Sequence, residues 1–290
     1  MNTSDSSPKI YQIFSYQITP IHPKGIQLTI DSTVTSYKDL VEKKNQFFAE
    51  ILSDDKLKLI KPPARIKGFG LEKKHKEYFI FTIQVKRSML RTNEEKAKEH
   101  IPDFPFITIV IDNRKESQKI AIQKNTLAFH NPLQVAEILE YSFSKYLNNY
   151  QLDISINGMF SSRKFWDIVK QKEDKIEEVM FELGKPNLTR INKTLTTQMK
   201  ELLLSTNSKK GTVILKAHEK ESIKLSKTDS RLNGIVSADS QGMGDIKLKF
   251  RHERQRFSTK NIPTEKIITE GEIHNLTDDK LNKVLDKLLS

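Results

Sequence analysis

The feature that most constrains the fold is a regular succession of segments in which the apolar residues repeat with one of two periods. Strand-like alternation of apolar and polar residues occurs at 119–123, 152–156, 176–183 and 212–216, and helical spacing of apolar residues separates these segments. A period of two residues indicates a strand and one of 3.6 residues a helix. Each such element has an apolar face that must pack against another layer. The second half is therefore predicted to follow a β-α-β-α-β-α-β rhythm.

Helix-start signals support this rhythm. Asn131 precedes Pro132 and an apolar stripe, Ser161 or Ser162 precedes a short amphipathic stretch, and Asn187 precedes a longer one that extends to residue 203. Asn and Ser are preferred N-cap residues, and proline is favoured in the first helical position. Three helices are expected between the strands.

The first half adds strands at 10–19, 25–30 and 78–86 and a helix at 38–52. Segments 107–111 and 119–123 are predicted to pair as a hairpin, which makes part of the sheet antiparallel. The expected fold class is α+β, with a mixed β-sheet and helices packed on it.

The periodicity lapses between residues 88 and 105, a charged stretch that contains Pro102 and Pro105. The predicted organisation is a disordered tail at 1–8, an N-terminal α+β region at 9–87, a linker at 88–105 and a C-terminal α+β region at 106–290. A single continuous domain is the alternative.

The 290-residue chain contains no cysteine, which excludes disulfides, cysteine-ligated metal and thiol catalysis. The polar stretch 1–8 lacks the apolar segment of a secretory signal, and no apolar run approaches the roughly 18 residues of a membrane span. We expect a cytoplasmic protein with no membrane partner.

The chain carries 49 Lys and Arg against 37 Asp and Glu, a net charge of +12. A charge of this size attracts polyanions, above all DNA or RNA, through counterion release. An acidic protein is the second candidate partner. The alternative is that the excess charge is spread evenly and only keeps the protein in solution.

Two segments concentrate the positive charge. The first, 61–76, contains prolines and glycines and is predicted to be a flexible loop for phosphate contact and base stacking. Its candidate binding residues are Lys61, Arg65, Lys67, Phe69, Lys73 and Lys74.

The second segment is a strand in which Ile246, Leu248 and Phe250 are expected to face inward. Alternation then places a row of cations outward, at a spacing of about 6–7 Å that resembles the spacing of phosphates. The predicted row and its continuation comprise Lys247, Lys249, Arg251, Arg254 and Arg256. The alternative is an edge strand that charge protects from pairing.

A further candidate is the helix start at Ser161, Ser162, Arg163 and Lys164, where hydroxyls, free N–H groups and two cations could hold an anion. An ordinary N-cap explains the same residues.

No catalytic motif is complete. Asp112 and Lys124 end two hairpin strands, as in metal-dependent nucleases, but Ile122 occupies the position of the second carboxylate. A turn held by Asp112 is the alternative. No two histidines have the spacing of a helical metal pair, and no phosphate-binding glycine loop is present. No metal or cofactor is expected.

The stretch Gln241-Gly242-Met243-Gly244-Asp245 is the remaining glycine motif. Two glycines separated by one residue let a backbone approach a phosphate closely, or they form a tight turn or bulge.

Three strings, at 61–70, 182–188 and 242–248, resemble uncharacterised bacterial proteins from phage-defence gene neighbourhoods. The resemblance transfers no catalytic residue. It implies a function in host–phage conflict. Together with the basic charge, it predicts a nucleic-acid-binding, non-catalytic component of an antiphage system that acts with a second protein or as a homo-oligomer. The alternatives are a protein-interaction or inhibitor module of host–phage conflict and a divergent metal-dependent nuclease.

Overall fold

A computed structural model describes residues 7–21, 34, 36–184, 205–206, 208 and 210–289. It contains helices and several β-sheets, which confirms the predicted α+β class. The strand predicted at 25–30, the helix predicted after Asn187 and most of the tail predicted at 1–8 lie outside the described residues.

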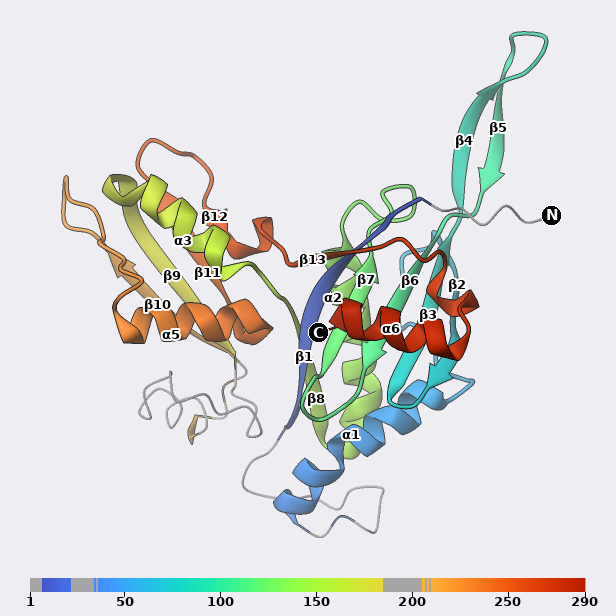
Figure 1. Ribbon diagram of the computed structural model, residues 1–290, viewed down its shortest axis with the longest axis horizontal. Coiled ribbons are helices and arrows are strands. Elements are labelled where there is room, and N and C mark those ends of the chain that lie inside the picture. The colour runs from blue at the N-terminus through green and yellow to red at the C-terminus, as the bar shows by residue number, and fades with distance from the viewer. Residues whose placement is uncertain are drawn as a thin grey trace. The chain divides into compact units, whose positions relative to one another are not determined.

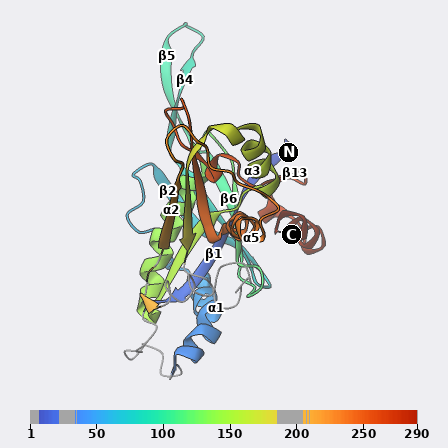
Figure 2. The ribbon, with the colours of Figure 1, turned by 90° about the vertical axis from the view of Figure 1, so that its left-hand side faces the viewer.

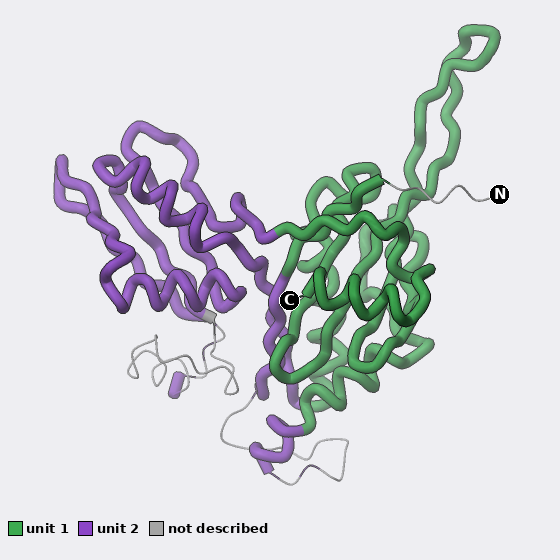
Figure 3. Tube along the Cα trace, viewed as in Figure 1, with its two compact units in different colours: residues 1–13, 43–150, 265–290 green, residues 14–42, 151–264 purple. Residues whose placement is uncertain are grey.

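The chain divides into two compact units whose segments alternate along the sequence (Figure 3). Unit 1 comprises Met1–Ile13, Lys43–Tyr150 and Glu265–Ser290, and unit 2 comprises Phe14–Glu42 and Gln151–Thr264. The chain therefore does not divide near 88–105 as predicted. That segment is a hairpin inside unit 1, and strands distant in sequence pair to build each unit.

Unit 1 is built on a sheet with the strand order β13-β1-β7-β6-β3-β2. The strands are β1 (Lys9–Pro20, whose first residues belong to this unit), β2 (Ile66–His75), β3 (Tyr78–Val85), β6 (Phe106–Asp112), β7 (Lys119–Gln123) and β13 (Glu265–Ile268). The hairpin predicted at 107–111 and 119–123 is confirmed, with Ile109 opposite Ile122.

Helix α1 (Tyr37–Ser53, which belongs to this unit from Lys43 onward) and α2 (Pro132–Leu147) lie on one face of this sheet, and α6 (Asp278–Leu289) lies on the other (Figures 1 and 2). Phe48 packs edge-on against Phe143, which joins α1 to α2. The side chain of Asn131 accepts a hydrogen bond from Leu133 N at 2.8 Å, so the predicted cap is confirmed.

Strands β4 (Arg87–Thr92) and β5 (Lys98–Asp103) form a separate two-stranded sheet in unit 1. The residues predicted to form a linker pair in antiparallel register, from Arg87 opposite Asp103 to Thr92 opposite Lys98. Their lack of apolar periodicity follows from their exposure, because neither face of the hairpin packs on a core.

Unit 2 contains a sheet with the strand order β10-β9-β11-β12. Its strands are β9 (Ile176–Gly184), β10 (Lys210–Lys216), β11 (Gly244–Phe250) and β12 (Phe257–Ser258). Helices α3 (Ser162–Gln171) and α5 (Ser230–Ala238) share one apolar core with β9 and β11, which includes Trp166, Phe181, Val236 and Leu248. In the same unit, β8 (Leu152–Gly158) pairs with Phe14–Pro20 of β1.

The described part of the second half follows the predicted rhythm from β7 through α2, β8, α3 and β9. Within the described residues, no helix combines the length and apolar character that a membrane crossing requires.

Candidate nucleic-acid interface

The predicted row on β11 has the expected alternation. Ile246, Leu248 and Phe250 are buried, and Lys247 and Lys249 lie on the opposite face. The row is nevertheless not a free line of positive charge, because its neighbour β9 carries acidic residues.

Three glutamates of β9 bind the cations of this row. Arg256 lies 2.8 Å from Glu178, and both Lys249 and Arg251 lie 3.6 Å from Glu177. Lys247 pairs with Glu182. Arg254 is exposed and forms no ion pair within the described chain. Four cations, two of them on β11 itself, thus pair with three acids of β9, and their charge is largely balanced.

The segment 61–76 also differs from the prediction, because most of it is strand β2 rather than a flexible loop. Phe69 is not displayed for stacking on a base: its ring stacks on Phe81 with centroids 5.1 Å apart. Lys73 pairs with Asp278 at 2.8 Å, and Lys74 lies 5.2 Å above the ring of Phe79. These residues anchor β2 to its own unit.

Four cations lie at the open end of the β2–β3 hairpin, and a fifth, Lys61, precedes β2 by five residues. We call these five the basic cluster. Its members are Lys61, Arg65, Lys67, Lys86 and Arg87. Lys86 N donates a hydrogen bond to Arg65 O at 2.8 Å, which fixes the end of β3 beside the start of β2. The register shifts between Ile66 and Gly68, and this bulge contains Lys67. Bulges redirect side chains.

The two arginines of the cluster are held by the segment before α2. The Arg65 guanidinium lies 5.3 Å from the centroid of the Phe129 ring. Arg87 donates hydrogen bonds to the carbonyl oxygens of Leu127 and Ala128, each at 3.0 Å. These contacts position both guanidinium groups, and none of them supplies a formal negative charge.

No member of the basic cluster forms an ion pair with any described residue. Asp103 is the nearest acid along the ladder, opposite Arg87, and its carboxylate accepts a hydrogen bond from Phe104 N. Lys61, Lys67 and Lys86 are exposed, and Phe104 is 46% exposed at the same end of the sheet. The cluster therefore combines unpaired cations with an accessible aromatic ring.

Sequence reasoning identified Lys61, Arg65 and Lys67 but missed Lys86 and Arg87. Those two residues follow a strand that pairs with 66–75, and only the hairpin register places them beside the first three. The sequence signal that could have identified these two residues is the strand pattern of β3, which Lys86 and Arg87 follow directly.

At the start of α3, Ser161 is the N-cap, and its hydroxyl accepts a hydrogen bond from Lys164 N at 3.3 Å. Ser162 is the first helical residue, while Arg163 and Lys164 are exposed. The arrangement is an ordinary cap, which is the alternative considered for these residues.

The structure does not bring Asp112 and Lys124 together as the layout of a metal-dependent nuclease would require. Asp112 lies opposite Lys119, so antiparallel pairing places Lys124 at the other end of the hairpin, about 17 Å away by strand rise. The Asp112 side chain is fully buried and accepts hydrogen bonds from Arg114 at 2.7 and 2.9 Å. This carboxylate holds the β6–β7 turn.

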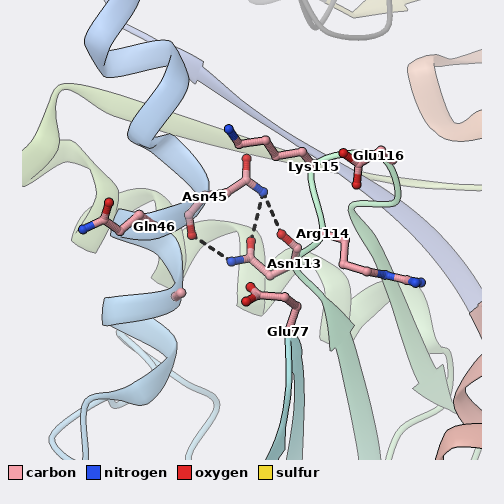
Figure 4. Close-up of a pocket in the computed structure, with 8 residues that line it drawn as sticks. Asn45, Gln46, Glu77, Asn113, Arg114, Lys115 and Glu116 are labelled. Carbon is pink, nitrogen blue, oxygen red and sulfur yellow. Dashed lines mark hydrogen bonds between the residues drawn. The ribbon is translucent and has the colours of Figure 1, made fainter.

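A shallow hollow of about 450 Å³ lies between α1 and this turn (Figure 4). Asn45 and Asn113 face each other there: Asn113 Nδ2 donates to Asn45 O at 2.7 Å, and Asn45 Nδ2 donates to Asn113 O at 2.9 Å. Two cations and two acids complete the charged part of the rim, namely Arg114, Lys115, Glu77 and Glu116. The buried amides satisfy one another, and the rim is neutral.

The glycine motif packs tightly inside unit 2. Gly242 has φ +82°, and a Cβ there would lie 2.6 Å from Ser15 Cβ. At Gly244 a Cβ would lie 1.8 Å from Glu182 O. Both glycines are thus required by close packing in a turn, and Gly244 leaves no room for a phosphate on that side.

Among the described residues, no group of three or more His, Asp and Glu side chains is placed to hold a metal ion. No protein-family model, curated protein or solved structure matches the chain.

Proposed function

We propose that the protein binds nucleic acid through the basic cluster of unit 1. The observation that carries this proposal is the contrast between two sets of cations. Those on β11 are bound by the acids of β9, whereas the five of the basic cluster have no acidic partner in the described structure. Unpaired cations attract phosphates most strongly, because no existing ion pair has to be broken.

The chemistry of the cluster fits a phosphate backbone. Arg65 and Arg87 supply two positive charges in fixed positions, and three exposed lysines extend the positive field. Phe104 is the accessible ring for stacking on a base. The cluster contacts backbone charge and carries no groups arranged to read base edges, so we expect binding with little sequence preference.

The resemblance to phage-defence proteins supports an antiphage setting for this binding, in which the chain would act beside a separate enzyme or sensor. That setting stays a prediction. A protein-interaction role is the second candidate, and the exposed β4–β5 hairpin favours it.

The test compares three charge-matched triple variants in fluorescence-anisotropy titrations with short single-stranded and duplex oligonucleotides. The cluster variant is Lys61→Ser, Lys67→Ser, Lys86→Ser, which spares the two anchored arginines. The row variant is Lys247→Ser, Lys249→Ser, Arg251→Ser. The control variant is Lys115→Ser, Lys280→Ser, Lys283→Ser, which removes three exposed lysines of unit 1 from outside the cluster.

All three variants lose the same formal charge, so a difference between them reports position. Five phosphate contacts predict a slope of about −4.5 in log K against log salt for the wild type on duplex DNA. For the cluster variant, we expect the salt slope to be shallower by about three units. Its affinity at moderate salt should be at least tenfold lower than that of the wild type. The row and control variants should bind as the wild type does. Equal losses in all three would show that only net charge matters and would overturn the site.

A further inference from the structure

The β4–β5 hairpin, residues 87–103, is here called the arm. It extends beyond the rest of unit 1 in two perpendicular views (Figures 1 and 2). All twelve of its strand positions pair only within the arm. Every one of them is exposed or half-buried, so neither face of the arm buries a residue. An isolated two-stranded hairpin is at best marginally stable in water, and both of its edges expose unpaired backbone groups. The arm therefore leaves two strand edges open to pairing with another chain.

Exposed apolar residues gather on the arm and at its root. Met89 is 57% exposed and Leu90 55%, and Phe104 and Leu127 at the root are 46% and 66% exposed. Large aliphatic side chains on an unprotected strand favour pairing rather than solvation.

The charge of the arm indicates what kind of chain covers it. Residues 87–103 contain four cations and four acids, within a chain of net charge +12. Within the ladder, Glu99 lies opposite Arg91. A neutral surface with both signs does not attract a polyanion or a strongly acidic protein, but it complements a second copy of itself.

The two edges of the arm are not equivalent. β5 contains Pro102, which has no N–H to donate, and proline protects an edge strand from pairing. β4 contains no proline and carries Met89 and Leu90. The β4 edge is the one open to a further strand.

We propose that the arms of two copies of this chain pair antiparallel through β4 and form a symmetric dimer with a continuous four-stranded sheet. A twofold axis through an antiparallel pair places one residue opposite itself. If that residue were Met89, Arg87 would oppose Arg91 of the second copy, and directly opposed like charges are destabilising. With Leu90 on the axis, Ser88 opposes Thr92 and the two Leu90 side chains meet.

Sedimentation equilibrium and light scattering test the association without assuming anything about nucleic acid. The wild type should show a mass that rises with concentration to twice 33.6 kDa. The variant Met89→Ser, Leu90→Ser should remain monomeric, with its dimer dissociation constant weakened at least about tenfold. The matched control is Ile214→Ser, Leu215→Ser, which removes two adjacent exposed aliphatic residues, 47% and 44% exposed, from the edge strand β10.

Cross-linking tests the register. The chain has no cysteine, so a single introduced thiol can form a disulfide only with a second copy. Leu90→Cys should give a disulfide-linked dimer under mild oxidation at concentrations where the wild type is dimeric. Ile214→Cys should not.

A wild type that stays monomeric at every concentration would overturn the proposal, and so would a dimer that survives Met89→Ser, Leu90→Ser. Loss of the dimer in the β10 control alone would move the interface to unit 2. Circular dichroism melting of each variant verifies that the units remain folded. Binding of a short oligonucleotide by the arm variant keeps this test separate from that of the basic cluster.

Discussion

Asp239 is the most unusual residue of the described chain. Its side chain is fully buried, and neither carboxyl oxygen has a hydrogen-bond partner among the described atoms. Burial raises its pKa well above the ordinary value, and the negative charges of Asp245 and Glu182 raise it further. Asp245 differs because Ser258 and Thr259 donate hydrogen bonds to it. A π-helical turn, residues Asp239–Met243, holds Asp239 beside these acids.

This residue makes stability depend on pH. Because its pKa in the folded chain exceeds the unfolded value of about 3.9, its favourable contribution is complete below that pH and declines as pH rises toward the folded pKa. We expect Asp239→Asn to raise the melting temperature at pH 8 by about 3 °C, equivalent to about 1 kcal/mol, and to change little at pH 4. The exposed control Asp167→Asn should melt as the wild type does at both values. Destabilisation of Asp239→Asn at pH 8 would contradict this account.

At the scale of elements, hydrophobic period and capping residues were sufficient to predict β1, α1, α2, α3 and the β6–β7 hairpin. Sequence position could not reveal which strands are neighbours. The cations of β11 appeared as a row because nothing along 245–256 shows that Glu177, Glu178 and Glu182 of β9 lie beside them. For the same reason, only part of the basic cluster could be predicted from the sequence, since Lys86 and Arg87 join it only through the register of β3 with β2.

The ion pairs of the β9–β11 pair lead to a prediction for this element. Removing the acids with Glu177→Gln, Glu178→Gln, Glu182→Gln should release the β11 cations and create a second nucleic-acid-binding surface. The affinity should rise at least tenfold at low salt, and the salt slope should steepen by about three units. The control Asp167→Asn, Glu173→Gln, Glu219→Gln adds the same charge at exposed positions of unit 2, and anisotropy titrations should show a smaller gain. An equal gain in both variants would mean that pairing on β9 does not mask the row.

At the scale of the whole molecule, the two units cannot be separated by cutting the chain once. Each is assembled from segments that alternate along the sequence, and β1 supplies strand residues to both. The region 106–290, which the sequence predicted as a C-terminal α+β region, lacks β1, β2 and β3. Without them, β6 loses its partner β3 and β8 loses the strand Phe14–Pro20.

Two deletions test which segments are needed for a folded core. One removes the strands that precede residue 106, and the other removes the arm. A fragment of residues 106–290 should be unfolded or aggregated, because the β3 and β1 edges would be absent and the apolar faces of β6 and β8 uncovered. Replacing 88–102 by Asn-Gly should leave the melting temperature within about 3 °C of the wild type, because the arm buries no side chain. Heteronuclear NMR distinguishes the two results, since a folded chain gives dispersed amide signals. A folded 106–290 fragment would restore the predicted domain boundary, whereas unfolding on removal of the arm would show that the hairpin supports the core of unit 1.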